Sequence, residues 1–255
     1  MRALVVPTRI ERQALLRALP SLLPLPEWAV PAWRAGELLV LECGIGPAQA
    51  EAVLPQLERA SPQALWLVGW CGGLRDDLRV GDLVLADATL IGSTQDAVPV
   101  DHPPPQALAD WLGAWAASHG RRLVVAPMLT SPRLVARAAD KRAAAATRAA
   151  AVEMEAAPLA RWAAEHAVPF RHLRVVLDPV ASDLPPAARP RMGEELHGER
   201  ELGAGTGGYV WRAVWRPRTW PAAWRLLHQA RRASRTMASL GAALTASGAP
   251  LDVEH

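Results

Sequence analysis

The chain has 255 residues with a formal net charge of +3, and 51% of its residues are apolar. This length suits one large α/β domain or two small ones, and the apolar content provides a substantial core and excludes global disorder. No run approaches the roughly 20 apolar residues of a membrane-spanning helix, and the first residues lack the pattern of a signal peptide. Cys43 and Cys71 follow no disulfide or zinc spacing. We therefore expect a soluble, cytoplasmic protein, attached at most peripherally to the inner face of the membrane.

The positive charge comes almost entirely from arginine, since Lys141 is the only lysine. Such a bias is typical of a GC-rich coding sequence. Basic residues are spread over most of the chain and become denser after residue 210. The chain as a whole lacks the basic surface bias of a nucleic-acid-binding protein, so we expect no nucleic-acid partner.

Short apolar runs alternate with helical stretches along most of the chain. Strands are expected at 2–7, 37–44, 64–70, 82–91, 122–129 and 172–178. Helices are expected at 9–19, 47–59, 105–119, 132–148 and 153–167. Because strands that alternate with helices build a mostly parallel sheet covered on both faces, the pattern predicts an α/β fold. A single domain over residues 1–255 is the economical interpretation.

The C-terminal part of the chain has a different composition. Residues 183–208 are rich in Gly and Pro and predict a flexible connection. Residues 209–245 predict a helical segment rich in Trp and Arg, broken near Pro217 and Pro221. Two proline-rich stretches earlier in the chain predict loops, 19–31 and 98–106.

A first glycine turn joins a predicted strand to a helix. Gly44 and Gly46 precede Pro47, which occupies the first helical position that proline prefers. Such glycines let the backbone approach a ligand, and a helix N-terminus attracts anions or hydroxyl oxygens. The third glycine of the dinucleotide-binding fingerprint is replaced by Gln49. A tight turn without a ligand is the alternative interpretation.

A second turn, Trp70-Cys71-Gly72-Gly73, ends the apolar strand expected at 64–70. Small molecules commonly bind to α/β sheets at the carboxyl ends of strands. The second turn therefore predicts a pocket.

Four blocks in chain order resemble motifs of the purine nucleoside phosphorylase and nucleosidase superfamily, in the branch with methylthioadenosine/adenosylhomocysteine nucleosidase. They are CGIGPAQAEA, VGWCGGLRDDLRVGDLVLAD, AVEMEAAPLA and LRVVLDP. A narrower resemblance, to the hopanoid-associated phosphorylases, is carried by ADKRAAAATRAAAVEMEA and LRVVLDPVASDLPPAA. That group is implicated in removing adenine from adenosylhopane, and futalosine hydrolases share the same scaffold.

The resemblance implies a three-layer α/β/α sandwich with a mixed, mostly parallel central sheet. It also implies a homo-oligomer that acts on a small-molecule nucleoside and needs no metal or organic cofactor. Phosphate remains open as a co-substrate, because the superfamily includes phosphorylases.

The residue assigned to help the purine base depart is Asp178. A purine leaves most easily when N7 receives a proton or a strong hydrogen bond from a carboxyl of raised pKa. Asp178 ends an apolar strand, where burial would raise its pKa, and it aligns with the base-protonating aspartate of the family. Capping of the Asp178-Pro179 turn is the alternative. A serine often precedes this aspartate in the family, and because Leu177 stands there, another group must orient the carboxyl.

Binding of the sugar is assigned to the motif Glu153-Met154-Glu155. By resemblance, Glu155 accepts hydrogen bonds from the 2′- and 3′-hydroxyls of the ribose, and Met154 provides an apolar wall. Glu153 either supports the ribose site or only stabilises the positive end of the following helix.

The residue assigned to position the attacking nucleophile is Glu11. Related nucleosidases keep an acid after the first strand to position the attacking water, and Glu11 is the only acid there. Arg9 and Arg12 flank it, and phosphorylases of the superfamily bind phosphate with arginine near this turn. Water and phosphate both remain open, and a surface helix carrying these charges is the alternative.

The pocket floor is assigned to the glycines at 44, 46, 72 and 73. Trp70 and Cys71 stand where related nucleosidases have small residues. A tryptophan at this place would reshape the pocket and argues against ordinary methylthioadenosine turnover.

The C-terminal segment contains four tryptophans interleaved with arginines, Trp211, Trp215, Trp220 and Trp224. The first pair and the last pair are each spaced four apart, so each pair shares one helical face. Tryptophan beside arginine suits a membrane interface with anionic lipid headgroups, where a hopanoid-linked nucleoside would be found. Ordinary packing of the segment over the site is slightly favoured over membrane contact, because large aromatic side chains bury well.

The sequence predicts cleavage of the N-glycosidic bond of a 5′-substituted adenine nucleoside, with adenosylhopane of hopanoid biosynthesis as the favoured substrate. The alternatives are methylthioadenosine/adenosylhomocysteine nucleosidase, futalosine hydrolase, and a non-enzymatic nucleoside-binding or membrane-associated module.

Overall fold

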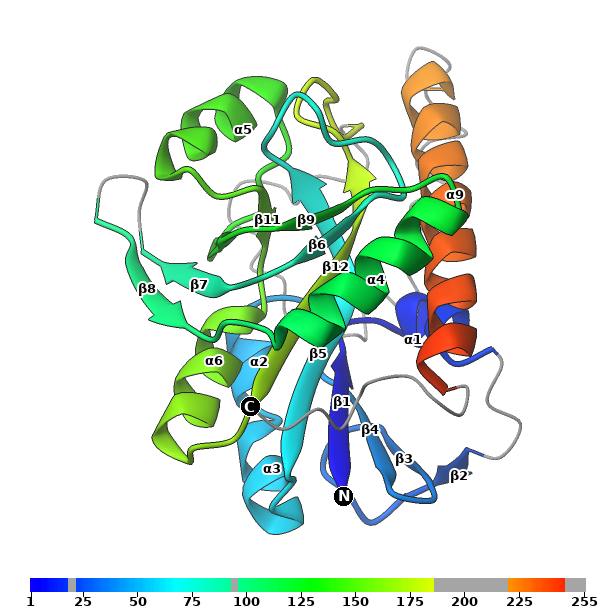
Figure 1. Cartoon of the computed structure of the whole chain (residues 1–255), viewed down its shortest axis with the longest axis vertical. Coiled ribbons are helices and arrows are strands. Elements are labelled where there is room, and N and C mark those ends of the chain that lie inside the picture. Colours follow the sequence, from blue (N-terminus) through cyan, green and yellow to red (C-terminus); the bar gives the residue numbers. More distant parts are fainter. Residues whose placement is uncertain (18–21, 93–95, 186–219, 246–255) are drawn as a thin grey trace.

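The computed structural model describes residues 1–17, 22–92, 96–185 and 220–245, and shows a twisted sheet with helices on both sides (Figure 1). Most of the predicted connection at 183–208 lies outside these residues, as does the first part of the segment at 209–245. None of the described helices is long and apolar enough to cross a membrane.

The centre of the sheet consists of parallel strands with buried apolar side chains. β1 (Arg2–Val6) lies between β4 (Leu38–Glu42) and β5 (Ala64–Gly73) and is parallel to both. β12 (Phe170–Asp178) pairs in parallel with β5. Each of these strands corresponds to one of the apolar runs in the sequence, as expected for strands covered on both faces.

Shorter strands extend the sheet on both sides of this centre, so that the described residues form one mixed sheet of twelve strands. The main order is β2-β3-β4-β1-β5-β11-β10-β7-β8, and β12 also pairs with β6, which pairs with β9. The prediction of a mixed, mostly parallel sheet is confirmed. The remaining strands are β2 (Leu23–Pro24), β3 (Ala32–Ala35), β6 (Leu83–Leu85), β7 (Ala88–Ile91), β8 (Val98–Asp101), β9 (Leu123–Val125), β10 (Met128–Thr130) and β11 (Ala151–Glu153).

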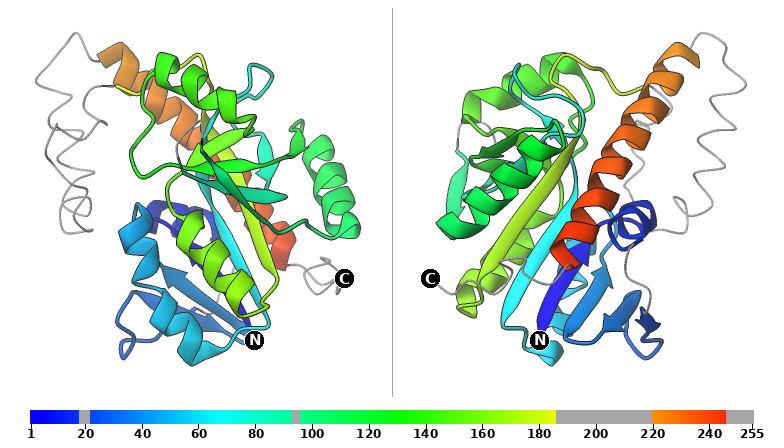
Figure 2. Two further views of the ribbon diagram at one scale, coloured as in Figure 1. Left: turned by 90° about the vertical axis from the view of Figure 1, so that its left-hand side faces the viewer. Right: turned by 45° about the vertical axis from the view of Figure 1, so that its right-hand side comes forward.

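Helices cover both faces of the sheet, which makes three layers (Figure 2). One apolar core lies between the sheet and α1, α4 and α9, and a second lies between the sheet and α2, α3 and α6. The three-layer prediction is therefore confirmed. The helices are α1 (Arg9–Leu15), α2 (Pro47–Glu51), α3 (Leu54–Ala60), α4 (Gln106–Ser118), α5 (Ala138–Ala144), the 3-10 turn η1 (Ala145–Thr147), α6 (Ala156–Glu165) and α9 (Trp220–Thr245).

Several elements predicted as single pieces are divided. The strand expected at 82–91 becomes β6 and β7, and the strand expected at 122–129 becomes β9 and β10. The helix expected at 47–59 becomes α2 and α3, and only the second half of the stretch 132–148 is helical, as α5 and η1. Apolar content alone does not reveal where a chain bends from one strand or helix into the next.

The two proline-rich stretches predicted as loops each contribute an edge strand, which corrects that prediction. β2 and β8 are the ends of the main strand order. Proline is tolerated at a sheet edge because its missing N–H need not donate to a neighbour. The helix expected from 153 also starts later, because 151–153 form β11.

Helix α9 packs very closely against the N-terminal part of the chain. A Cβ atom built on Gly241 would overlap the backbone carbonyl of Leu15, the last residue of α1. Ala233, Met237 and Leu240 of α9 are fully buried in the core that also contains Leu15. A glycine at 241 is therefore required for α9 to lie against α1, which carries Glu11.

Candidate active site

Four acidic side chains are buried near the carboxyl ends of the central strands. Glu11 lies in α1 after β1, Glu153 ends β11, Glu155 precedes α6, and Asp178 ends β12. Each is at most 5% exposed. Because buried carboxylates need partners to offset desolvation, their surroundings define the site.

Arg174 is the cation around which three of these acids gather. Its side chain is fully buried, and its Nη2 donates to Glu153 and, over 3.0 Å, to Oε2 of Glu155. The charge of Arg174 also lowers the pKa of Glu11, against the larger effect of burial. The sequence block LRVVLDP contains this arginine, but sequence reasoning did not single it out. An arginine inside an otherwise apolar strand is the signal that could have identified it.

Glu153 is fully occupied by protein groups. Its Oε1 accepts from the hydroxyl of Thr130, and its Oε2 accepts from the backbone N–H groups of Glu155 and Ala156, both at 2.9 Å. The second pair satisfies free donors at the start of α6. With Arg174 on the same oxygen, Glu153 supports the site and the helix N-terminus together.

Glu155 connects the first glycine turn to this cluster. The backbone N–H of Gly46 donates to its Oε1 over 3.0 Å, while Arg174 holds its Oε2. Gly46 has a φ of 99°, and a Cβ atom there would lie 4.0 Å from Cε of Met154. Burial raises the pKa of Glu155 to about 7, against the opposing charge of Arg174.

Glu11 lies on the other side of Arg174. Its Oε1 accepts from the backbone N–H of Trp70 and its Oε2 bonds to the hydroxyl of Thr8, both at 2.6 Å. Burial raises its pKa. The charge of Arg174 therefore does not offset burial at either Glu11 or Glu155, and both have raised pKa values.

Asp178 lies apart from Arg174, at a register shift between Val176 and Asp178 where β12 pairs with β5. Its Oδ2 contacts the ammonium group of Lys141, and its Oδ1 lies 3.6 Å from a Cβ built on Gly72. Burial raises the pKa of Asp178 to about 6, although Lys141 acts in the opposite direction. The carboxyl can therefore hold a proton close to neutral pH, and it lies beside Gly72 near the end of β5.

The model of the phosphorylase superfamily matches residues 31–201. The chain belongs to the phosphorylase superfamily. Among curated proteins it is similar to AMP nucleosidase of Escherichia coli strain K12, with 34% identity over 83 residues. The match covers 32% of this chain and 17% of that enzyme.

Several solved structures share the fold of this chain. The methylthioadenosine/S-adenosylhomocysteine nucleosidase of Helicobacter pylori has a TM-score of 0.65 at 16% identity, covering 94% of this chain and 96% of that chain. The S-adenosylhomocysteine nucleosidase of Streptococcus pyogenes has a TM-score of 0.64 at 17% identity, covering 96% and 97%. The futalosine hydrolase of Helicobacter pylori has a TM-score of 0.59 at 18% identity, covering 69% of this chain and 87% of that chain. At these identities the likeness is one of fold.

Within this superfamily fold, the two predicted arginines do not join the carboxylate cluster. Arg12 donates to Glu42 over 2.7 Å, and its guanidinium lies 3.8 Å from the ring centre of Trp33. Arg9 is exposed at the start of α1. Gly44 has a φ of 87° and donates to the backbone carbonyl of Pro7, which ties the first glycine turn to the end of β1.

Residues 70–73, predicted as a second turn, are instead the last part of strand β5, so the side chains of Trp70 and Cys71 lie on opposite faces of the sheet. The indole of Trp70 packs against the core beneath α1, α4 and α9, while its backbone N–H holds Glu11. Cys71 is buried in a different apolar cluster, and burial raises the pKa of its thiol, so the thiol stays neutral. Gly72 and Gly73 leave room for Asp178 at the end of the strand.

Gly69 explains how Glu11 and Arg174 come so close to β5. A Cβ atom at this position would collide with Nη1 of Arg174 and lie 2.8 Å from Oε1 of Glu11. We expect Gly69→Ala to displace both groups, to lower activity on the order of 100-fold, and to reduce the unfolding free energy by about 1–3 kcal/mol. Steady-state kinetics and urea unfolding measure the two effects.

The matched control for this prediction is Gly113→Ala in α4. A Cβ there would approach only Cδ2 of Leu123, at 4.0 Å. This helical replacement should keep activity and raise the unfolding free energy by about 0.5–1 kcal/mol. Equal effects of the two substitutions would contradict the role given to Gly69.

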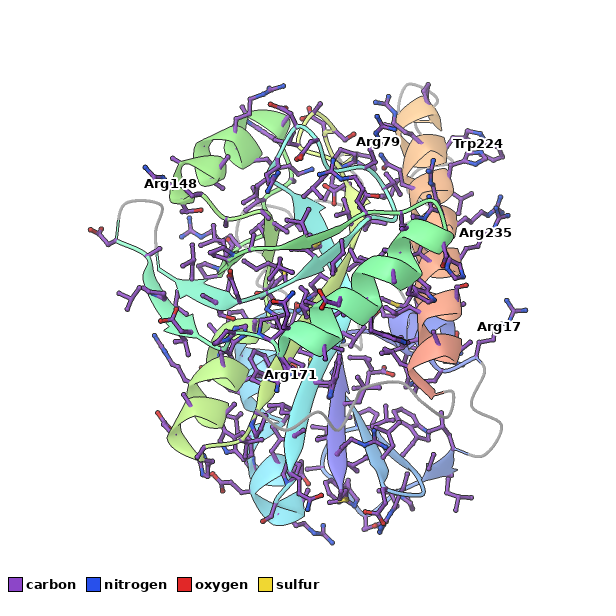
Figure 3. The ribbon with its side chains drawn as sticks, in the orientation of Figure 1. Arg17, Arg79, Arg148, Arg171, Trp224 and Arg235 are labelled. Carbon is purple, nitrogen blue, oxygen red and sulfur yellow. The ribbon has the colours of Figure 1, made fainter. Side chains whose placement is uncertain are left out.

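Of the four C-terminal tryptophans, Trp224 is the one whose side chain the structure describes. Trp211, Trp215 and the side chain of Trp220 lie outside the described residues. Trp224 is 62% exposed. Figure 3 shows Trp224 and Arg235 projecting from the outward side of α9, with Arg17 pointing in the same general direction.

Proposed function

We propose that this protein cleaves the N-glycosidic bond of an adenine nucleoside with a substituent at its 5′ position and releases adenine. Two features together carry the proposal. Asp178 is a separate buried carboxyl with a raised pKa, and Glu155, Arg174 and Glu11 form a cluster around strand β5. The names of AMP nucleosidase and of the nucleosidases with the same fold support this reaction class.

In the proposed reaction Asp178 assists the departing base. The C1′–N9 bond breaks, its electron pair remains with adenine, and the proton of the Asp178 carboxyl passes to N7. A buried carboxyl with a pKa of about 6 has the proton affinity that this role needs near neutral pH.

Glu155 holds the sugar in the same proposal. Binding of the ribose hydroxyls to its oxygens would replace part of the hydrogen bonding that Gly46 and Arg174 now provide. A carboxylate near C1′ also stabilises the positive charge that develops on the sugar.

The nucleophile is water positioned by Glu11 or, as the alternative, phosphate. The water oxygen forms the new bond to C1′ as the C1′–N9 bond breaks, and one proton of the water passes to the carboxylate of Glu11. Burial and the hydrogen bonds from Thr8 and Trp70 fix Glu11 in one orientation, which suits a group that orients water. Arg12 is engaged with Glu42 and Trp33, which favours water over phosphate.

The finer proposal is that the 5′ substituent is a lipid of the adenosylhopane kind and that α9 contacts the membrane surface. Between residues 220 and 245 the helix has four arginines and no acidic residue. Trp224 and Leu227 are 62% and 40% exposed, and Arg231 and Arg235 follow on the same side at helical spacing. Such a face suits anionic headgroups.

Adenine release, followed by chromatography, tests the reaction. Methylthioadenosine and a 5′-alkyl adenosine in detergent are compared, each with and without phosphate. Release from the alkyl substrate alone supports the lipid nucleoside, whereas comparable release from methylthioadenosine assigns the protein to general nucleosidase activity. Adenine binding without release from any nucleoside would instead favour a silent binding module.

Vesicle binding tests the membrane contact. We expect the protein to sediment with vesicles that contain anionic lipid, less so at high salt. Replacing Arg231 and Arg235 together with alanine should weaken this binding by roughly tenfold or more, at about 1 kcal/mol per arginine. Arg142→Ala, an exposed arginine of α5, is the control and should have no effect. Equal binding to neutral vesicles, or no loss in the double variant, would contradict the contact.

A further inference from the structure

Lys141 is the only lysine among the 28 lysine and arginine residues of the chain, and its side chain is completely buried in α5. Burial of an ammonium group is costly unless it is paired and hydrogen-bonded. A single buried lysine in a chain that otherwise uses arginine therefore indicates a place where only an ammonium group fits.

The surroundings of Lys141 fit the ammonium group closely. Its Nζ contacts Oδ2 of Asp178 and donates to the backbone carbonyls of Pro179 and Ser182, at 3.1 and 2.9 Å. An ammonium has three protons, and here it has three acceptors. The planar, longer fork of arginine would not reach three acceptors that converge on one point.

Further hydrogen bonds fasten the start of α5 to the segment that follows Asp178. The backbone N–H of Ala138 donates to Oδ1 of Asp183 over 2.7 Å, and the backbone N–H of Leu184 donates to the carbonyl of Ala136 over 2.8 Å. Lys141 is thus held in place from both sides, and its position does not depend on Asp178 alone.

No other side chain in the described part of the molecule hydrogen-bonds to the carboxyl of Asp178. The preceding residue, Leu177, packs against an apolar core and has no polar group. Besides Lys141 of α5, the ionisable side chain that faces Asp178 among the described residues is Cys71 of β5, which stays neutral. Lys141 is therefore the one cation in direct contact with this carboxyl.

We propose that Lys141 is a positioning residue, which holds Oδ2 of Asp178 so that the carboxyl is directed at the departing base. The inference rests on the proposed function and extends it. As the proton of Asp178 passes to N7, the carboxyl becomes negative, and the ammonium group stabilises this charge where it develops. Stabilisation that grows along the reaction accelerates the step.

The test uses Lys141→Met, which keeps the side-chain length and removes the charge. Asp178 is titrated by NMR in protein labelled with ¹³C at the aspartate carboxyl carbon, and its signal is the one missing from Asp178→Asn. In Lys141→Met we expect its pKa to rise by roughly one unit or more above about 6, because the opposing cation is gone. Arg142→Met, an adjacent exposed arginine, should leave it unchanged. An unshifted pKa in folded Lys141→Met overturns the proposal.

Single-turnover adenine release provides the second readout. Lys141→Met should lower the rate roughly 100-fold with little change in substrate binding, and should have no further effect when Asp178 is already asparagine. An equal loss in both backgrounds would mean that Lys141 acts independently of Asp178. If Lys141→Met does not fold, Lys141→Arg replaces it, with an expected loss of rate and a nearly unchanged pKa. A fully active Lys141→Arg then overturns the inference.

The titration also separates this inference from the proposed function. If the wild-type protein releases adenine from no nucleoside, the proposed function fails, and the NMR titration still decides whether Lys141 controls Asp178. If the wild type is active and Lys141→Met changes neither the pKa nor the rate, only the inference fails.

Discussion

Asp178→Asn is expected to lower the rate of adenine release by about 10²–10⁴-fold. The amide has nearly the same shape as the carboxyl but cannot give a proton to N7. It can still accept from Lys141, and the carbonyls of Pro179 and Ser182 keep their bonds to the ammonium. The protein should therefore remain folded, with a lower melting temperature because a buried ion pair is lost. Single-turnover kinetics and circular dichroism measure the two effects.

Asp77→Asn is the matched control for this result. Asp77 forms ion pairs with Arg75 and Arg122 in an exposed loop, and neither arginine pairs with an acid of the candidate site in the described residues. Its replacement should leave adenine release unchanged. An Asp178→Asn variant that is folded and fully active would refute the role of Asp178 in base departure.

Arg174→Met is expected to reduce the unfolding free energy by about 3–5 kcal/mol, because it leaves buried carboxylates without their shared cation. Glu153 and Glu155 lose a direct ion pair, and Glu11 loses a nearby charge. Urea unfolding of the variant and the wild type measures the difference. Activity should fall with it, since Glu155, to which we assign ribose binding in the proposed function, is no longer held by Arg174.

The pH dependence of this loss has a definite sign. Without Arg174 the folded-state pKa values of Glu11 and Glu155 rise further above their unfolded values, and the pKa of Glu155 is already about 7. Stability tied to a raised pKa is complete below the unfolded value and is lost as pH rises through the folded value. Both proteins share the same unfolded pKa, so the gap between variant and wild type should widen only as pH rises above about 7, the folded-state pKa of Glu155 in the wild type.

Arg171→Met is the control on the same strand. Arg171 is also buried, but in the described residues it donates to a backbone carbonyl and has no ion pair with a carboxylate. Its replacement should cost much less, and with no pH dependence in this range. A loss as large as that of Arg174→Met would mean that burial of arginine on β12, and not the acid cluster, accounts for the stability.

The central strands could be predicted from sequence because burial on both faces produces continuous apolar runs. β1, β5 and β12 follow from this rule. The edge strands β2 and β8 could not, since their prolines are ordinarily signs of loops and are acceptable only at a sheet edge, which is a property of the whole sheet. The late start of α6 has a similar cause, because pairing of β11 with β5 and β10 competes with helix formation.

The acids of the candidate site could be listed from sequence because they fall within recognisable motifs. Their partners could not. Arg174 and Glu11 interact although more than half of the chain's length separates them in sequence. Lys141 contacts Asp178 because α5 lies over the end of β12. In a chain with so many arginines, one more in a strand carries little information until its buried neighbours are known.

The solitary buried lysine has a practical consequence for chemical labelling. Amine-reactive reagents act on lysine and on the amino terminus, and Lys141 is fully shielded in the folded chain. A fluorophore or surface linkage added under native conditions should therefore attach at one end of the polypeptide. Labelling of Lys141 as well would show that α5 had moved away from the segment after β12 and exposed the ammonium group.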